Sequence, residues 1–172
     1  MKKLLVIVLL LCFTSIAHAA PVQTIISTTA RRYAPPSFYG IQMVLQLPVG
    51  VTPHFDPTAP GQNLIDPTSI TSLNTLNLST NTLISAEYQP SSSSSVGDTV
   101  TIALSNSNGI GYGILMDVLC DFKTDFVPTY SSSGNVNNVS FKIASVTLFD
   151  ANGATIPSKY ISVSINNTYV WK

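Results

Sequence analysis

The chain has 172 residues, of which only 9% are charged, and its eight basic and eight acidic residues cancel. A protein that binds phosphates needs clustered Lys and Arg, and beyond Lys2 and Lys3 the only adjacent basic pair is Arg31 and Arg32, so the composition excludes a nucleic-acid binder. Abundant Ser, Thr and Asn favour strands with neutral polar faces over helices decorated with Glu and Lys.

The first nineteen residues have the features of an export signal. Lys2 and Lys3 precede an apolar run at residues 4–13, and Ala17 and Ala19 supply the small residues that a signal peptidase reads. The run is too short to span a bilayer, which takes about 20 residues. We therefore expect residues 1–19 to be removed, leaving a periplasmic, cell-surface or extracellular protein without a transmembrane segment.

Residues 20–37 are expected to form a flexible N-terminal segment or an edge strand. A β-branched run at residues 22–26 favours a strand, whereas Pro35 and Pro36 interrupt regular sheet hydrogen bonding. The remaining residues, 38–172, are sufficient for one domain with a single core.

Alternating apolar residues predict a strand at residues 39–47. A proline-dense loop follows it, in which Asp66 and Pro67 have the residue types that cap a single helical turn. Further short strands are expected at residues 76–78 and 83–88, and the serine run at 91–95 is expected to be a flexible hairpin loop. The inward face of the first strand is predicted to carry Ile41, Met43, Leu45 and Leu47.

Residues 99–122 are the most informative segment. Two strands with alternating apolar residues flank a glycine-containing turn, and they are expected to form a hairpin. The first strand places Val100, Ile102 and Leu104 on one face. On the second strand the apolar face is Ile114, Met116, Val118, Cys120 and Phe122, and the opposite face is Leu115, Asp117, Leu119 and Asp121.

Cys120 is the only cysteine left after export, because Cys12 lies within the leader. No intramolecular disulfide is therefore expected, although pairing between chains stays open. We expect Cys120 to be a buried thiol that packs like a small apolar side chain. A reactive thiol would need a nearby base, and the only histidine of the mature chain, His54, is expected to lie far away in the proline-rich loop.

The last third of the chain predicts three more strands. At residues 141–149 the apolar face switches near Ala144, as a β-bulge would cause, and residues 150–153 form the turn that follows. Two strands are expected at residues 160–165 and 168–171. In total, seven to nine strands at this spacing indicate an all-β protein folded as an antiparallel β-sandwich.

Four segments between residues 39 and 156 match a known pattern when they are taken in chain order. They are residues 40–45 (GIQMVL), residues 100–104 followed by 109–113 (GIGYG), residues 114–122 and residues 146–153 (VTLFDANG). Together they resemble the cohesin family, which belongs to the carbohydrate-binding-module superfamily of jelly-roll sandwiches in exported bacterial proteins. The sequence VGDTV at residues 96–100 is similar to the strand that usually opens a cohesin, but here it lies in the middle of the chain.

The resemblance implies a non-catalytic recognition module. Cohesins bind calcium-loaded dockerin modules through one face of the sandwich, and relatives in the superfamily bind polysaccharides, so either class is an expected partner. The resemblance places Leu115, Asp117 and Leu119 near the contact face; the alternative is that both leucines pack in a two-sided core. A second hypothesis is a structural subunit of an extracellular surface assembly, in which residues 22–26 pair with a neighbour's sheet edge.

No catalytic, metal or cofactor site is expected. Glycoside hydrolysis uses two facing carboxylates, and Glu87 is the only glutamate. A serine hydrolase needs a base, and His54 has no GxSxG partner. Residues 150–153 lack the further oxygen ligands of a calcium loop. The seven tyrosines and Trp171 are scattered, so no aromatic platform for sugars is evident along the sequence.

Overall fold

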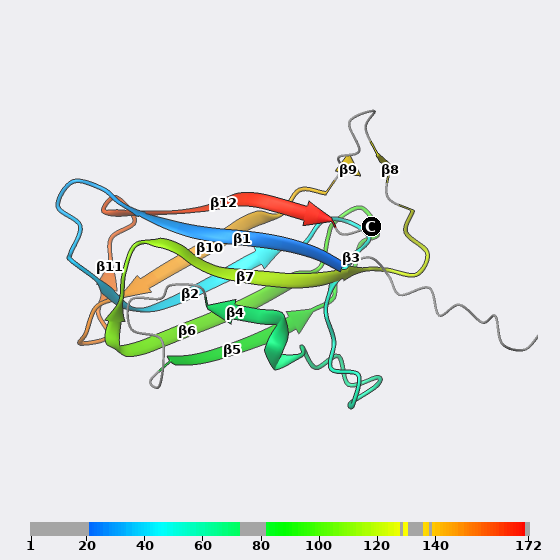
Figure 1. Cartoon of the computed structure of the whole chain (residues 1–172), viewed down its shortest axis with the longest axis horizontal. Helices are drawn as coiled ribbons and strands as arrows, with labels where there is room; N and C mark the ends of the chain where they lie inside the picture. The colour runs from blue at the N-terminus through cyan, green and yellow to red at the C-terminus, as the bar shows by residue number, and fades with distance from the viewer. Residues whose placement is uncertain (1–20, 73–81, 128, 131–135, 138, 171–172) are drawn as a thin grey trace, which may run out of the picture.

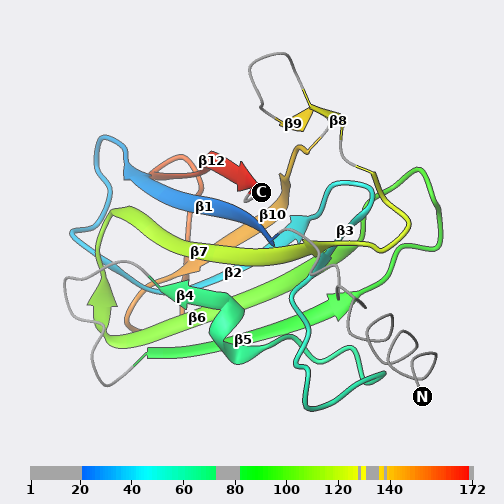
Figure 2. The same ribbon diagram turned by 45° about the vertical axis from the view of Figure 1, so that its right-hand side comes forward.

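The computed structural model describes residues 21–72, 82–127, 129–130, 136–137 and 139–170. These residues form an antiparallel β-sandwich, as predicted, with two layers of strands over one core (Figure 1). Figure 2 shows the same two layers turned by 45°, with a small two-stranded ribbon projecting from them. The expected leader at residues 1–19 and the expected strand at residues 76–78 lie outside the described part.

Sheet A has the strand order β12-β1-β7-β3, with β4 also paired to β7. Its strands are β1 (Pro21–Ala30), β3 (Val51–Pro53), β4 (Ile70–Ser72), β7 (Gly113–Phe122) and β12 (Ile161–Val170). Sheet B has the order β11-β10-β2-β6-β5. Its strands are β2 (Phe38–Gln46), β5 (Thr82–Gln89), β6 (Thr99–Ile110), β10 (Lys142–Phe149) and β11 (Thr155–Ile156). The projecting ribbon is β8 (Thr129–Tyr130) with β9 (Val136–Asn137).

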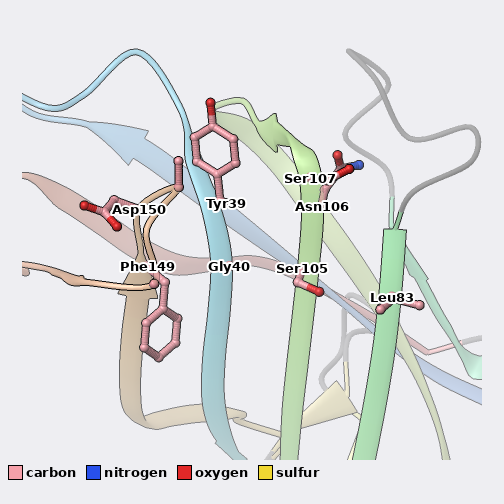
Figure 3. A pocket seen from close by; sticks show the side chains of 10 residues that line it. Tyr39, Gly40, Leu83, Ser105, Asn106, Ser107, Phe149 and Asp150 are labelled. Carbon is pink, nitrogen blue, oxygen red and sulfur yellow. The ribbon is translucent and has the colours of Figure 1, made fainter.

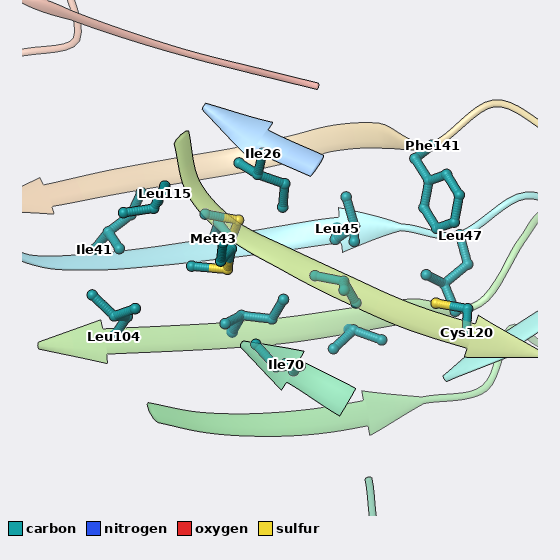
Figure 4. Close-up of a cluster of buried hydrophobic side chains, with 14 of the residues drawn as sticks. Ile26, Ile41, Met43, Leu45, Leu47, Ile70, Leu104, Leu115, Cys120 and Phe141 are labelled. Atoms are coloured by element: carbon teal, nitrogen blue, oxygen red, sulfur yellow. The ribbon is translucent and has the colours of Figure 1, made fainter. Parts of the chain in front are cut away.

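The core lies between the inner faces of the two sheets. The predicted inward residues of β2 and β6 are buried, because alternate side chains of a strand point to the same face. Figure 4 shows Met43 of β2 where β7 crosses over it, with Leu115 and Cys120 on that facing strand. The predicted inward residues that are buried are Ile41, Met43, Leu45, Leu47, Val100, Ile102 and Leu104, and Phe38 of β2 and Ile110 of β6 are buried as well.

β1 is an interior strand of sheet A, paired with β12 on one side and β7 on the other. The prediction of a flexible segment or an edge strand is therefore wrong for residues 21–30, and the sandwich does not start at residue 38. Val22 and Ile26 are fully buried, since the β-branched run places alternate side chains in the core. Pro35 and Pro36 lie beyond β1, in the connection that carries the chain to sheet B, so they interrupt no strand.

The two strands of residues 99–122 do not form a hydrogen-bonded hairpin. β6 pairs with β2 and β5, whereas β7 pairs with β1, β3 and β4. The turn between them carries the chain from sheet B to sheet A, and it is flanked by Gly109 and Gly113, whose φ angles are 86° and 122°. Each of the two strands has one apolar face, and both apolar faces are buried because the strands lie in opposite sheets and face each other across the core.

Several local predictions are confirmed. The register of β10 against β2 shifts between Ile143 and Ser145, which places the expected bulge at Ala144. β5 and β6 pair antiparallel around the serine loop. Asp66 caps the 3-10 turn Pro67–Ser69, and hydrogen bonds from the hydroxyl and amide of Thr68 hold the pKa of Asp66 below its ordinary value. The two strands expected after residue 159 are one continuous strand, β12.

Candidate functional site

The structure overturns the prediction that Leu115 lies on a contact face. The register of β7 against β1 shifts so that Met116 pairs with Ile26 and Ile114 pairs with Ser27, which leaves Leu115 as the extra residue of a bulge. Leu115 is fully buried and Ile114 is 50% exposed. A bulge reverses the facing of the residues beyond it, so Leu115 belongs to the core.

Asp117 and Leu119 do lie on the outer face of sheet A, where both are half-buried. Oδ2 of Asp117 accepts a hydrogen bond from Nε2 of Gln23 at 2.6 Å, and its Oδ1 is buried without a hydrogen-bond partner. The structure therefore brings together two of the three predicted residues. Asp117 is already engaged by its neighbour on β1, and the pair presents a small half-buried surface rather than an open one.

His54 lies against β7, contrary to the expectation that it is far from Cys120. Its amide donates to the carbonyl of Leu119 at 3.3 Å, and its Nδ1 lies 2.7 Å from Oδ2 of Asp121. Pro53 of β3 pairs with Cys120 in the ladder, which brings the loop close. Cys120 points inward and is fully buried, and burial raises the pKa of its thiol. The prediction of a buried thiol is confirmed.

Metal-binding groups are not clustered in the part of the chain that the structure describes. No set of three or more His, Cys, Asp or Glu side chains there is placed to hold a metal ion. The pair of His54 with Asp121 ties the loop to β7 and stands apart from Cys120, whose thiol lies on the other face of the strand.

Asp98 lies at the centre of a hydrogen-bonded polar cluster. Its side chain is nearly buried; Oδ2 accepts from Nζ of Lys123 at 2.9 Å and from the Tyr88 hydroxyl at 2.8 Å, and Oδ1 accepts from the Ser91 amide at 2.9 Å. Burial raises the pKa of Asp98, but these hydrogen bonds outweigh it and hold the pKa below its ordinary value. Because the bonds join the serine loop to β6 and Lys123, the cluster has a structural role.

A hollowed surface lies on the outer face of sheet B, where the sequence predicted no site. Phe149 of β10 pairs with Gly40 of β2, Gly40 pairs with Ser105 of β6, and Ser105 pairs with Leu83 of β5. These four residues therefore form one row across four strands (Figure 3). Gly40 is itself buried, and the Phe149 ring lies against the position that a Cβ there would take. A hollow of about 750 Å³ lies along this row, with Gly40, Phe149, Ser105 and Leu83 among its lining residues.

The hollow continues along the sheet. A second hollow of about 540 Å³ shares all four residues of the row and extends over Gln42, Ser85 and Ala103. The next row across the sheet is Thr147, Gln42, Ala103 and Ser85, which are paired in the same way. We call the two hollows together the sheet B groove; its central residues are Gly40, Gln42, Leu83, Ser85, Ala103, Ser105 and Phe149.

The rim of the sheet B groove is built from locally bonded polar groups. Nδ2 of Asn106 donates to Oγ1 of Thr82 at 2.8 Å, and its Oδ1 accepts from the Asn108 amide at 2.7 Å. Oδ1 of Asp150 accepts from the backbone amides of residues 152 and 154 at 2.9 and 2.8 Å. Tyr39 stands where β2 is irregular, between Phe38 and Gly40. The hydrogen bonds fix the positions of the Asn106 and Asp150 side chains.

One sequence signal points to this groove in retrospect. A glycine inside a strand often marks a place where another group approaches closely. A Cβ on Gly40 would lie 3.4 Å from Cδ2 of Phe149, which is ordinary contact, so the ring covers one side of the glycine. The other partners of Gly40 come from strands far away in the sequence, and no local pattern links them.

No protein-family model matches the sequence, and no curated protein or solved structure matches it either. The resemblance to cohesins therefore depends on the four sequence segments alone. In the part of the chain that the structure describes, no helix is both long enough and apolar enough for a membrane crossing.

Proposed function

We propose that the protein is an exported, non-catalytic recognition module that binds a macromolecule through the outer face of sheet B. The observation that carries the proposal is the row of Phe149, Gly40, Ser105 and Leu83, which opens a groove on a sheet face. The resemblance to cohesins names two classes of partner, a dockerin-like protein module and a polysaccharide.

The physical properties of the two outer faces support this choice. On sheet A, Asp117 and Asp121 are engaged by Gln23 and His54. On sheet B, the two rows of the groove lie within stretches of the four strands where the pairing is uninterrupted, so a hydrogen-bonded ladder holds the groove residues. A rigid surface loses little conformational entropy when a partner binds, which favours affinity.

The test is a pair of arginine substitutions, one on each outer face. Ala103→Arg places a long charged side chain in the sheet B groove, and Thr71→Arg places the same side chain on the exposed β4 residue of sheet A. Binding is measured by calorimetry with a calcium-loaded dockerin module and by affinity electrophoresis with soluble polysaccharides. We expect at least one partner to bind the parent and the Thr71→Arg variant but not the Ala103→Arg variant.

Two results contradict the proposal. One is that no partner of either class binds the parent protein. The other is that Ala103→Arg binds as the parent does, which would place the contact elsewhere. Thermal melting of both variants serves as the control for folding, since both substitutions are on partly or fully exposed residues.

The alternative of a structural subunit needs a different contact from the one predicted. Residues 22–26 are paired on both sides within sheet A and offer no edge to a neighbour. β12, by contrast, ends the strand order of sheet A, and its ten residues, ISVSINNTYV, include no charge and no proline. Natural edge strands usually carry charged residues or proline, which prevent them from pairing with the sheet edge of another molecule. Association that rises with concentration and is abolished by Ser164→Lys would support this mode, and a monomer at all concentrations would refute it.

A further inference from the structure

We infer that the partner held in the sheet B groove is a neutral polysaccharide, with one sugar unit seated over Gly40 and its apolar face against the ring of Phe149. This inference rests on the proposed function and deepens it, because it commits to the chemical class of the ligand.

The shape of the groove suits a chain of rings rather than a single small side chain. Gly40 forms the floor, and Phe149 and Leu83 stand on either side of it along one row of the sheet (Figure 3). Four adjacent strands span about 14 Å, since neighbouring strands lie about 4.8 Å apart. The larger hollow, about 750 Å³, is an open depression on the sheet rather than an enclosed cavity, which leaves room for a chain to continue on both sides.

The chemistry of the groove matches the two kinds of surface that a sugar ring presents. A pyranose has apolar C–H faces and a rim of hydroxyls. Phe149 is half-buried and Leu83 is 75% exposed, so both offer apolar surface to a ring face. Between them Ser105, Ser85 and Gln42 are exposed and supply hydroxyl and amide groups within the same two rows of the sheet. Such groups fix the orientation of a ligand in a largely apolar site.

The charge of the groove favours a neutral ligand. Among the residues that line the two hollows, Asp150 is the only charged one. A uronate or sulfated chain would place its negative charge near this carboxylate, with no lining cation to offset the repulsion. A negatively charged protein surface would be repelled by Asp150 in the same way, whereas a neutral polysaccharide needs no complementary charge.

The test uses the protein secreted from the full chain, in gels that contain mixed-linkage β-glucan, xyloglucan, galactomannan, dextran or the anionic polygalacturonate. Two variants on β6 are matched. Ser105→Arg fills the groove, and Thr101→Arg places the same side chain on the same strand two rows away, opposite Val44 and Glu87. Phe149→Ala removes the apolar wall.

We expect at least one neutral polysaccharide, and not polygalacturonate, to retard the parent and Thr101→Arg. Ser105→Arg should abolish the retardation, and Phe149→Ala should raise the Kd by about tenfold, as expected for the loss of one aromatic contact. The inference is overturned if no neutral polysaccharide retards the protein, if polygalacturonate is preferred, or if Ser105→Arg binds like Thr101→Arg. Should a dockerin module alone bind, and be lost in Ala103→Arg, the proposed function stands and the polysaccharide inference fails.

Discussion

Replacing Leu115 by alanine should destabilise the protein far more than replacing its neighbour Ile114. The bulge on β7 turns Leu115 into the core, where it is fully buried, and leaves Ile114 50% exposed. Truncating a fully buried leucine costs about 2–5 kcal/mol, because burial is lost and a cavity remains. For a half-exposed isoleucine the expected cost is about 1 kcal/mol. Simple strand alternation predicts the opposite order.

The comparison is measured by thermal and urea unfolding of the two variants. For a chain of this size, each kcal/mol lowers the Tm by about 2–4 °C, so a loss of about 3 kcal/mol in Leu115→Ala lowers it by roughly 6–12 °C. The Ile114→Ala variant should fall by no more than about 4 °C. In urea the midpoints should shift in the same order with unchanged slopes, since a changed slope would report a change in the denatured state.

Equal losses, or a larger loss for Ile114→Ala, would refute the reasoning. Either result would mean that β7 runs without the bulge and that Ile114 fills the core. Leu115 would then return to the outer face of sheet A beside Asp117 and Leu119, and the contact face inferred from the cohesin resemblance would regain its third residue.

Three further predictions concern polar, thiol and backbone features. The pKa of Asp98 is lower in the folded state than its unfolded value of about 3.9, so the stability that the ionised carboxylate contributes is fully present above that pH and is lost as the pH falls through the folded pKa. Asp98→Asn should therefore lower the free energy of unfolding at pH 7 by roughly 1–3 kcal/mol and flatten the acid side of the curve of stability against pH. An unaltered curve contradicts this prediction. In a Cys12→Ser variant, Cys120 should react with Ellman's reagent only in denaturant, because Cys120 is buried and burial raises the pKa of its thiol. Rapid reaction in the folded protein would show that the thiol is accessible. A Cβ on Gly97 would lie 1.7 Å from the carbonyl oxygen of Leu47, so Gly97→Ala should lower the Tm sharply, and a parent-like melt would show that this close approach is absent.

Features that depend on neighbouring residues were predictable. Alternation places Met43 and Ile102 in the core, because side chains of a strand repeat every two residues whatever the strand pairs with. The bulge at Ala144 is visible as a switch of the apolar face within one strand. Asp66 caps its turn through contacts with a residue two positions away. Each signal lies within one segment, so no knowledge of the pairing is needed.

Features that depend on strand pairing were not predictable in the same way. β1 is interior because β12, from the other end of the chain, pairs beside it. The bulge at Leu115 is defined by the register of β7 against β1, and it interrupts an alternation that looks regular along the sequence. Whether β6 and β7 lie in one sheet or face each other is likewise a choice between pairings that the same alternation allows.

The candidate site shows the same division. An all-β chain, the inward faces of most strands and the lack of clustered charge can be read from composition and period-two alternation, because both are local properties. The placement of Gly40, Ser105, Leu83 and Phe149 in one row is a property of the folded protein alone. The register of four strands from distant parts of the chain creates that row, and register is set by the packing of the whole core.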